Sequence, residues 1–359
     1  FQSWSAGAIR PTSWRAYLDE VRAIALALHR SGIAAGDRVA ILAGPRPEWV
    51  VAALAILSVG GIPVGVHQTS SRPEVRHVLE NSGATAIFVE TADDADKVAA
   101  LSADLDRLRI AVGLDIRPSG LAGGVEVQTW QQMCADGRRL AAADPALFEK
   151  LVEAGDVDQP AGLFYTSGST GAPKGVTHTH RTIQYSVLGF AMSYPELGRT
   201  RHDLVGFLGL SHVAPALIAV YAPIMTRLVI THCSIEERLA ALIGVRPTAV
   251  LWPPRMHEKL AAEALQALAG SGRVFRFRYR LAMTVARRVS ARRWQQRGLP
   301  GYLRAADSVA RKLVFVPLLA MVGMDRIQVT WTASGSMTPA VAALWHMWHI
   351  HGSYGFRHS

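Results

Sequence analysis

The sequence predicts an α/β protein with open, largely parallel sheets covered by helices. Residues 36–42 have the pattern of a buried strand, residues 47–61 that of a helix that starts at a proline and stops at glycines, and residues 62–66 that of a second strand. Strand, helix and strand in this order form a parallel βαβ unit. The order then repeats, with a helix predicted over residues 72–81 and a strand over residues 84–90.

Two further helices are predicted around this sheet. The first begins at Trp14, because Thr12 or Ser13 can cap it, apolar residues follow at helical spacing and Gly32 can stop it. The second is expected in the acidic and alanine-rich residues 93–105. Together these helices would cover the sheet of a doubly wound fold.

The length of 359 residues and the apolar fraction of 50% allow more than one hydrophobic core. A looser stretch is expected over residues 135–158, which predicts a boundary between approximate subdomains 1–150 and 151–359. The cysteines, Cys134 and Cys233, have no CxxC partner, so neither a disulfide framework nor a zinc knuckle is indicated. A cytoplasmic setting is expected.

The most hydrophobic stretch, residues 204–230, is long enough on paper for a membrane span. It contains His212, Pro215, Pro223 and Arg227, so buried strands and a core helix are the preferred interpretation. The chain opens on a phenylalanine without an export signal, and we expect it to be a fragment of a longer protein.

The formal net charge of +10 is concentrated in one segment. Residues 270–315 hold twelve Lys or Arg residues against one acid, Asp307. One interpretation is a surface for anionic lipid head groups, which would place the protein peripherally at a membrane. Solvated helix faces are the plainer alternative, and nucleic-acid binding is not expected because no recognised module accompanies the charge.

A short apolar strand at residues 163–165 leads into the sequence Thr-Ser-Gly-Ser-Thr-Gly-Ala-Pro-Lys-Gly, residues 166–175. Glycines let a backbone approach an anion closely, hydroxyls add donors and Lys174 adds a charge, so this loop predicts a phosphate site. It is not a Walker A loop, because Pro173 precedes the lysine and a glycine follows it. The lysine leads into an alternating strand instead of a helix.

The loop resembles the signature phosphate loop of the adenylate-forming, AMP-binding superfamily. Within it, the flanking text is similar to that of the long-chain fatty acyl-CoA synthetases, through "GDRVAILAGPRPEWVVAALAILSVGGIPVG", "QTSS", "GFLGLSHV", "PTAVLWPPRMHEKL" and "KLVFVPLLAMVGMDRIQVTWTASGSMTP". The resemblance implies that residues 1–359 are the N-terminal AMP-binding domain, incomplete at its C-terminus. The resemblance also implies that this chain does not include the small C-terminal α+β domain of the family.

The resemblance also implies a set of site residues. Lys174, Thr166 and His212 would be catalytic, His212 as a substrate-side residue, and Thr166 would also contact the metal. The loop residues Thr166, Ser167, Gly168, Ser169, Thr170, Gly171 and Lys174 would hold the ATP phosphates. Ser334, Gly335 and Ser336 would lie against adenine, and Tyr354 and Gly355 resemble the start of the motif that stacks on the base.

The implied function is ATP-dependent activation of a long-chain fatty acid through acyl-adenylate to acyl-CoA, with release of AMP and pyrophosphate. ATP and Mg²⁺ are the expected cofactors, and CoA is the co-substrate. After Gly355 the family has one variable residue, then Thr or Ser, and then Glu, whereas this chain has Phe356, Arg357 and His358. A catalytically incomplete homologue that binds only an acyl chain or a nucleotide is therefore the alternative.

Overall fold

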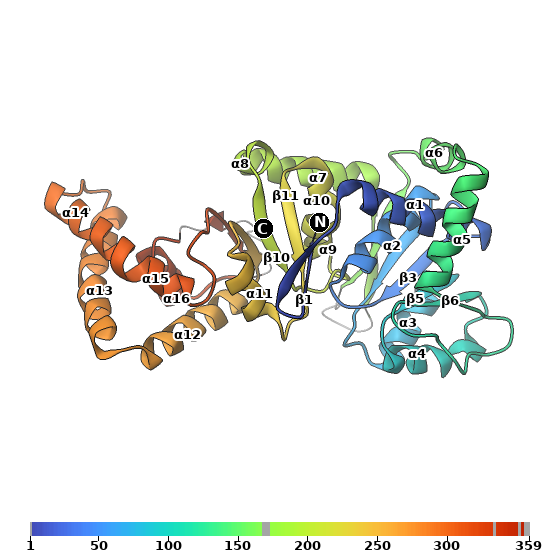
Figure 1. Ribbon diagram of the computed structural model, residues 1–359, viewed down its shortest axis with the longest axis horizontal. Helices are drawn as coiled ribbons and strands as arrows, with labels where there is room; N and C mark the ends of the chain where they lie inside the picture. The colour runs from blue at the N-terminus through green and yellow to red at the C-terminus, as the bar shows by residue number, and fades with distance from the viewer. Residues whose placement is uncertain (1, 167–172, 333–334, 351–352, 355–359) are drawn as a thin grey trace. The chain divides into compact units, whose positions relative to one another are not determined.

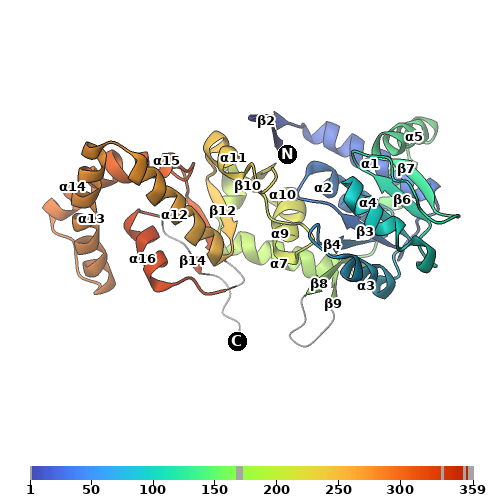
Figure 2. The same ribbon diagram turned by 90° about the horizontal axis from the view of Figure 1, so that it is seen from below.

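The computed structural model describes residues 2–166, 173–332, 335–350 and 353–354. The chain divides into two compact units (Figures 1 and 2). The first unit comprises Phe1–Ser3, Arg10–Arg201 and Gly206–Ile235, and the second comprises Trp4–Ile9, His202–Val205 and Glu236–Ser359. Each unit is described by itself below.

The first unit is built on a seven-stranded sheet that is parallel except for its last strand, which pairs antiparallel with its neighbour. The strands lie in the order β7 (Glu126–Thr129), β6 (Ile110–Gly113), β5 (Ala86–Val89), β3 (Arg38–Leu42), β4 (Ile62–Val66), β8 (Pro160–Thr166) and β9 (Lys174–Thr179). The α/β class and the parallel βαβ units predicted from the sequence are confirmed.

Helices cover both faces of this sheet (Figure 1). The helices of the first unit up to Arg201 are α1 (Trp14–Arg30), α2 (Pro47–Ser58), α3 (Arg72–Ser82), α4 (Ala92–Ala99), α5 (Trp130–Ala143), α6 (Leu147–Glu153), α7 (His180–Ser193) and α8 (Glu196–Arg199), with a 3₁₀ turn at Ser102–Asp104. The Ser13 side chain caps α1, and Ser71 with Glu74 forms a capping box at α3. The predicted start of α1 at Trp14 is confirmed.

The core follows the alternation of side chains along the strands. Ala40 and Leu42 of β3, with Val64 and Val66 of β4, lie in one buried cluster with apolar residues of α3 and α4. The intervening strand residues point to the opposite face, where α1 packs against α2 and α5. Burial on both faces is what the near-continuous apolar runs of these strands predicted.

The expectation of a looser stretch over residues 135–158 is wrong, because α5 runs to Ala143 and α6 occupies Leu147–Glu153. Thr129 and Gln132 form a capping box that starts α5. Gly137 then lets α5 press against α1: a Cβ at Gly137 would lie 1.8 Å from the carbonyl oxygen of Ala23. The helix is thus fixed by a tertiary contact that a local pattern does not reveal.

The hydrophobic stretch predicted as buried strands and a core helix spans several short elements. They are β10 (His202–Gly206), α9 (Val213–Ala216), a π-helical turn (Leu217–Tyr221), α10 (Ala222–Met225) and β11 (Leu228–His232), and β11 pairs parallel with β1 (Gln2–Ser5). Strand β2 is Ala8–Pro11. Among the described residues, no helix is long and apolar enough to cross a membrane.

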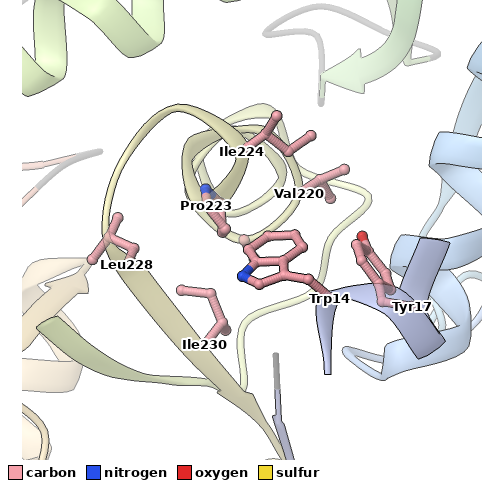
Figure 3. A pocket seen from close by; sticks show the side chains of 8 residues that line it. Trp14, Tyr17, Val220, Pro223, Ile224, Leu228 and Ile230 are labelled. Atoms are coloured by element: carbon pink, nitrogen blue, oxygen red, sulfur yellow. The ribbon is translucent and has the colours of Figure 1, made fainter. Parts of the chain in front are cut away.

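Trp14 and Tyr17 of α1 lie against this segment around a small apolar pocket, with Val220, Pro223 and Ile230 facing them (Figure 3). The cavity measures about 10 Å³, room for at most one water-sized sphere. It is a packing gap and holds no ligand site.

The second unit contains a three-stranded parallel sheet in the order β12 (Ala249–Trp252), β13 (Val329–Thr332) and β14 (Ser353–Tyr354). Its helices are α11 (Arg238–Val245), α12 (Pro254–Gly270), α13 (Arg273–Trp294), α14 (Gly301–Ala310), α15 (Val316–Ala320) and α16 (Pro339–Met347), with a π-helical turn at Arg311–Phe315. Trp252, Phe315 and Trp348 are among its fully buried side chains. The basic segment therefore forms a pair of packed helices, α13 and α14.

Buried histidines make the stability of the fold depend on pH. Burial lowers the pKa of His257 from 6.5 to about 4 and that of His232 to about 3. Below pH 6.5 the unfolded chain binds protons that the folded chain excludes, so stability is lost as the pH falls. For His257 alone the loss is about 2 kcal/mol at pH 5.

Urea unfolding at pH 7 and pH 5 measures this effect. His257 Nε2 shares a hydrogen bond of 3.0 Å with Thr332 Oγ1, which a glutamine amide can replace. We expect His257→Gln to reduce the pH dependence of the unfolding free energy by about the same 2 kcal/mol. An unchanged slope in this variant would show that His257 does not titrate on unfolding.

Candidate functional site

The phosphate-loop sequence lies at the carboxyl end of β8. Parallel strands present their carboxyl ends at one edge of a sheet, which is where open α/β folds bind ligands. β8 ends at Thr166 and β9 begins at Lys174, and these residues are directly opposite each other in the antiparallel pair. Both are exposed. The hairpin therefore holds the two ends of the loop together and leaves the lysine accessible to an anion.

Ser167, Gly168, Ser169, Thr170 and Gly171 lie outside the described residues. What the structure describes is the frame around them. The backbones of Thr166 and Lys174 are fixed by the pairing of β8 with β9.

The base of the loop is anchored on α3. His77 Nε2 lies 2.7 Å from the carbonyl oxygen of Pro173, and the Tyr165 hydroxyl donates a hydrogen bond of 2.7 Å to Asn81 Oδ1. The rings of His77 and Tyr165 meet edge to face at 6.2 Å. Sequence reasoning missed both α3 residues. His77 and Asn81 are four residues apart, so they lie on one face of α3. This spacing is the one feature of the sequence that could have indicated them.

His212 lies in a second cluster of the first unit, beside His67 at the carboxyl end of β4. The two imidazole rings are 4.1 Å apart and tilted by 54°. Ser211 Oγ shares a hydrogen bond of 2.7 Å with His67 Nδ1. His67 was not predicted as a site residue, because nothing in the local sequence links it to the Ser211–His212 pair.

Gly65 permits this close packing. A Cβ at Gly65 would lie 2.6 Å from Cα of Ser211, so a larger residue in β4 would push the Ser211 backbone away. Gly65 also pairs with Phe164 of β8. The contact of Ser211 with Gly65 therefore places His212, the next residue, near the sheet edge at which β8 ends.

Burial favours the neutral form of both imidazoles. Burial lowers the pKa of His67, and the charge of Glu74 opposes this only partly. Burial also lowers the pKa of His212, and the neighbouring His67 lowers it further. Neutral imidazoles can donate or accept hydrogen bonds without adding charge beside a substrate.

A third cluster at the same edge surrounds Glu90, which follows β5. Its carboxylate accepts hydrogen bonds from Gly44 N at 2.7 Å, from Gln68 Nε2 at 3.1 Å and from Arg46 Nη1 at 3.1 Å. Arg46 also pairs with Asp115. These groups satisfy one another, which indicates a structural role in tying together the ends of β3, β4 and β5.

A magnesium site was predicted at Thr166. In the part of the chain that the structure describes, no group of three or more His, Cys, Asp or Glu residues could hold a metal ion. Mg²⁺ prefers carboxylate and phosphate oxygens, and Thr166 offers one hydroxyl oxygen.

The residues predicted to lie against adenine belong to the second unit. Gly335 and Ser336 follow β13 and are exposed. Tyr354 is in β14, where it pairs with Thr332 of β13, so the carboxyl ends of these two strands are neighbours. Ser334 and Gly355 lie outside the described residues.

Comparisons with known proteins place these features in context. Residues 4–355 match the family model described as AMP-binding enzyme. The long-chain-fatty-acid–CoA ligase FadD15 of Mycobacterium bovis is 35% identical over 312 residues, which are 85% of this chain and 48% of that protein. The long-chain-fatty-acid–CoA ligase ACSBG2 of Rattus norvegicus is 25% identical over 334 residues, which are 91% of this chain and 49% of that protein.

The chain thus spans about half the length of the curated relatives it matches. Among solved structures, the A-PCP didomain of a carboxylic acid reductase from Segniliparus rugosus has a TM-score of 0.71 at 18% identity, covering 98% of this chain and 47% of that chain. The N-terminal domain of FACL13 from Mycobacterium tuberculosis has a TM-score of 0.65 at 19% identity, covering 99% and 71%. At these identities the two structures support the fold alone.

Proposed function

Because the chain belongs to the AMP-binding enzyme family, we propose that the protein activates a long-chain fatty acid with ATP and transfers the acyl group to CoA. The supporting observation is the β8–β9 hairpin, which places Lys174 opposite Thr166 at the two ends of a phosphate-loop sequence. Relatives at 35% identity are named long-chain-fatty-acid–CoA ligases, which favours a fatty acid as the carboxylate.

The proposed reaction has two steps. In the first, a carboxylate oxygen attacks the α-phosphorus of ATP, the new bond gives acyl-adenylate, and the bond to the β-phosphate breaks to release pyrophosphate. In the second, the CoA sulfur attacks the acyl carbon, the thiol proton is lost to solvent, and AMP leaves. Both anions of the first step approach each other, so offsetting their repulsion lowers the barrier.

Lys174 is proposed to supply positive charge at the phosphates, together with the backbone and hydroxyls of residues 166–171. Mg²⁺, when bound, would screen the phosphate oxygens further. His212, whose ring lies against that of His67, is proposed to hydrogen-bond the substrate carboxylate without forming an ion pair with it. Ser334, Gly335, Ser336, Tyr354 and Gly355 are proposed to contact the adenine base.

The test is exchange of labelled pyrophosphate into ATP in the presence of fatty acids of increasing chain length. We expect exchange that depends on the fatty acid and is strongest with long chains. Absence of exchange with every acid, together with measurable binding of ATP or fatty acid, would support the alternative of a homologue that binds and does not catalyse.

We also propose that the enzyme works peripherally at an anionic membrane surface on the cytoplasmic side. Helix α13 contains eight arginines and no acidic residue. Val274, Phe277 and Leu281 lie three and four residues apart along it, and their exposed fractions are 64%, 60% and 55%. An exposed apolar stripe among arginines is the composition of a helix that binds anionic lipid interfaces.

Sedimentation with vesicles tests this contact. Phosphatidylglycerol vesicles are expected to bind the protein and phosphatidylcholine vesicles to bind it weakly, with added salt releasing it. Phe277→Asp with Leu281→Asp should abolish sedimentation, whereas Ala305→Asp on exposed α14 should retain most of it. Equal binding by the double variant would refute the surface, and preferential binding to nucleic acid would replace it with another partner.

A further inference from the structure

The second unit contains a large cavity that none of the proposed nucleotide residues lines. Its volume is about 760 Å³, and its walls come from α13 and α16, from Gln295 and His349 just beyond their ends, and from one residue of α14. Figures 1 and 2 draw these helices in orange and red. The volume lies within the roughly 300–1,000 Å³ that is usual for sites of small ligands. The lining residues that carry the argument are Ala286, Val289, Ala342, Ala343, Trp294, Arg293, Asp307 and His349.

Small side chains leave this space open. Ala286 of α13 and Ala342 and Ala343 of α16 line it, where larger residues would close the gap between the helices. Aromatic contacts support the same pair of helices from within the core: Trp348 Nε1 donates a hydrogen bond of 3.3 Å to the Tyr279 hydroxyl. The helices are thus fixed relative to each other by contacts that do not fill the cavity.

One wall of the cavity is polar. The buried carboxylate of Asp307 lies 3.3 Å from Arg293 Nη2 and 3.1 Å from His349 Nε2. His349 directly follows the C-cap of α16 and has a left-handed backbone conformation, with φ of 65°, which is a common way for a helix to end.

Arg293 supplies the positive charge of this wall. Asp307 is the one acidic residue of the segment 270–315, and it is already engaged by Arg293 and His349. Arg293 uses Nη2 for this contact, and a guanidinium carries further N–H donors that remain available to a second acceptor. Its side chain is 45% exposed and lines the cavity.

From this arrangement we propose that the cavity binds an anionic amphiphile, with its carboxylate or phosphate on Arg293 and its hydrocarbon chain along the alanine-lined wall. The apolar lining would pack against the hydrocarbon chain of the ligand, and Arg293 would bind its anionic head group. The site is separate from the proposed catalytic residues, so its occupation does not depend on the proposed function.

Tryptophan fluorescence tests the proposal with 9,10-dibromostearate, because bromine quenches an indole ring that it contacts. Trp294 is 91% exposed and lines the cavity. We expect saturable quenching that Trp294→Phe removes. The dibromostearate methyl ester, which lacks the charge, should bind about 10-fold more weakly, as should the acid to Arg293→Gln. A dibromostearoyl lysophosphatidate distinguishes a lipid phosphate from a free carboxylate by its relative affinity.

Ala342→Phe is expected to fill the cavity and abolish quenching, while Ala305→Phe on exposed α14 should leave it unchanged. Equal affinity for acid and ester, or quenching that persists in both Trp294→Phe and Ala342→Phe, would overturn the proposal. Pyrophosphate exchange measured on the same samples separates the two proposals: quenching without exchange would refute the synthetase and leave the cavity site standing.

Discussion

Replacing Lys174 with alanine is expected to lower fatty-acid-dependent exchange of pyrophosphate into ATP by about 10²- to 10³-fold, the usual cost of losing one group that stabilises transition-state charge. The side chain is exposed at the end of the loop, and alanine can keep the backbone pairing with Thr166. The exchange rate at saturating ATP and fatty acid measures the effect.

A matched control separates the role of this lysine from a general loss of positive charge. Lys150 of α6 is also an exposed lysine of the first unit, and its contact is with Asp144 at 3.8 Å. Lys150→Ala should leave the exchange rate within about two-fold of the parent, because exposed ion pairs contribute little. A similar small loss in Lys174→Ala would remove the main support for the phosphate site.

Substitution of Gly65 by valine is expected to impair both stability and exchange. The new Cβ would lie 2.6 Å from Cα of Ser211, so the backbone that carries His212 must move. Overpacking of this kind costs about 1–3 kcal/mol of unfolding free energy. Displacement of His212 from the sheet edge should also lower exchange by about 10-fold or more, because catalytic geometry tolerates little misplacement.

Urea unfolding and exchange per folded molecule measure the two effects separately. Gly123→Val is the control, since a Cβ at Gly123 has no atom within 4 Å among the described residues. Full exchange activity in a destabilised Gly65→Val protein would show that the position of Ser211 and His212 does not matter to catalysis.

Much of the first unit could be predicted from the sequence because its signals are local. Apolar runs predicted β3, β4 and β5, and the capping residue Ser13 predicted the start of α1. The helical content of residues 135–158 escaped prediction because it depends on a long-range contact. Helix α5 packs closely against α1 where Gly137 contacts Ala23. No sequence pattern within residues 135–158 predicts that contact.

The candidate site could also be predicted only where its residues follow one another in the sequence. The phosphate-loop sequence is continuous, so it could be identified before the fold was known. Its anchor could not, because His77 and Pro173 are 96 residues apart, and His67 is 144 residues from Ser211. Strand order and helix placement bring these pairs together, and neither follows from local composition.

The antiparallel pairing of β9 with β8 has a consequence for the order of folding. A hairpin joins residues that are close along the chain, so its closure costs little conformational entropy, whereas β8 must find β4 across roughly a hundred residues. Strands β8 and β9 can therefore pair with each other before β8 pairs with β4. The imidazole pair, which needs β4 and the Ser211 segment together, would be completed among the last steps.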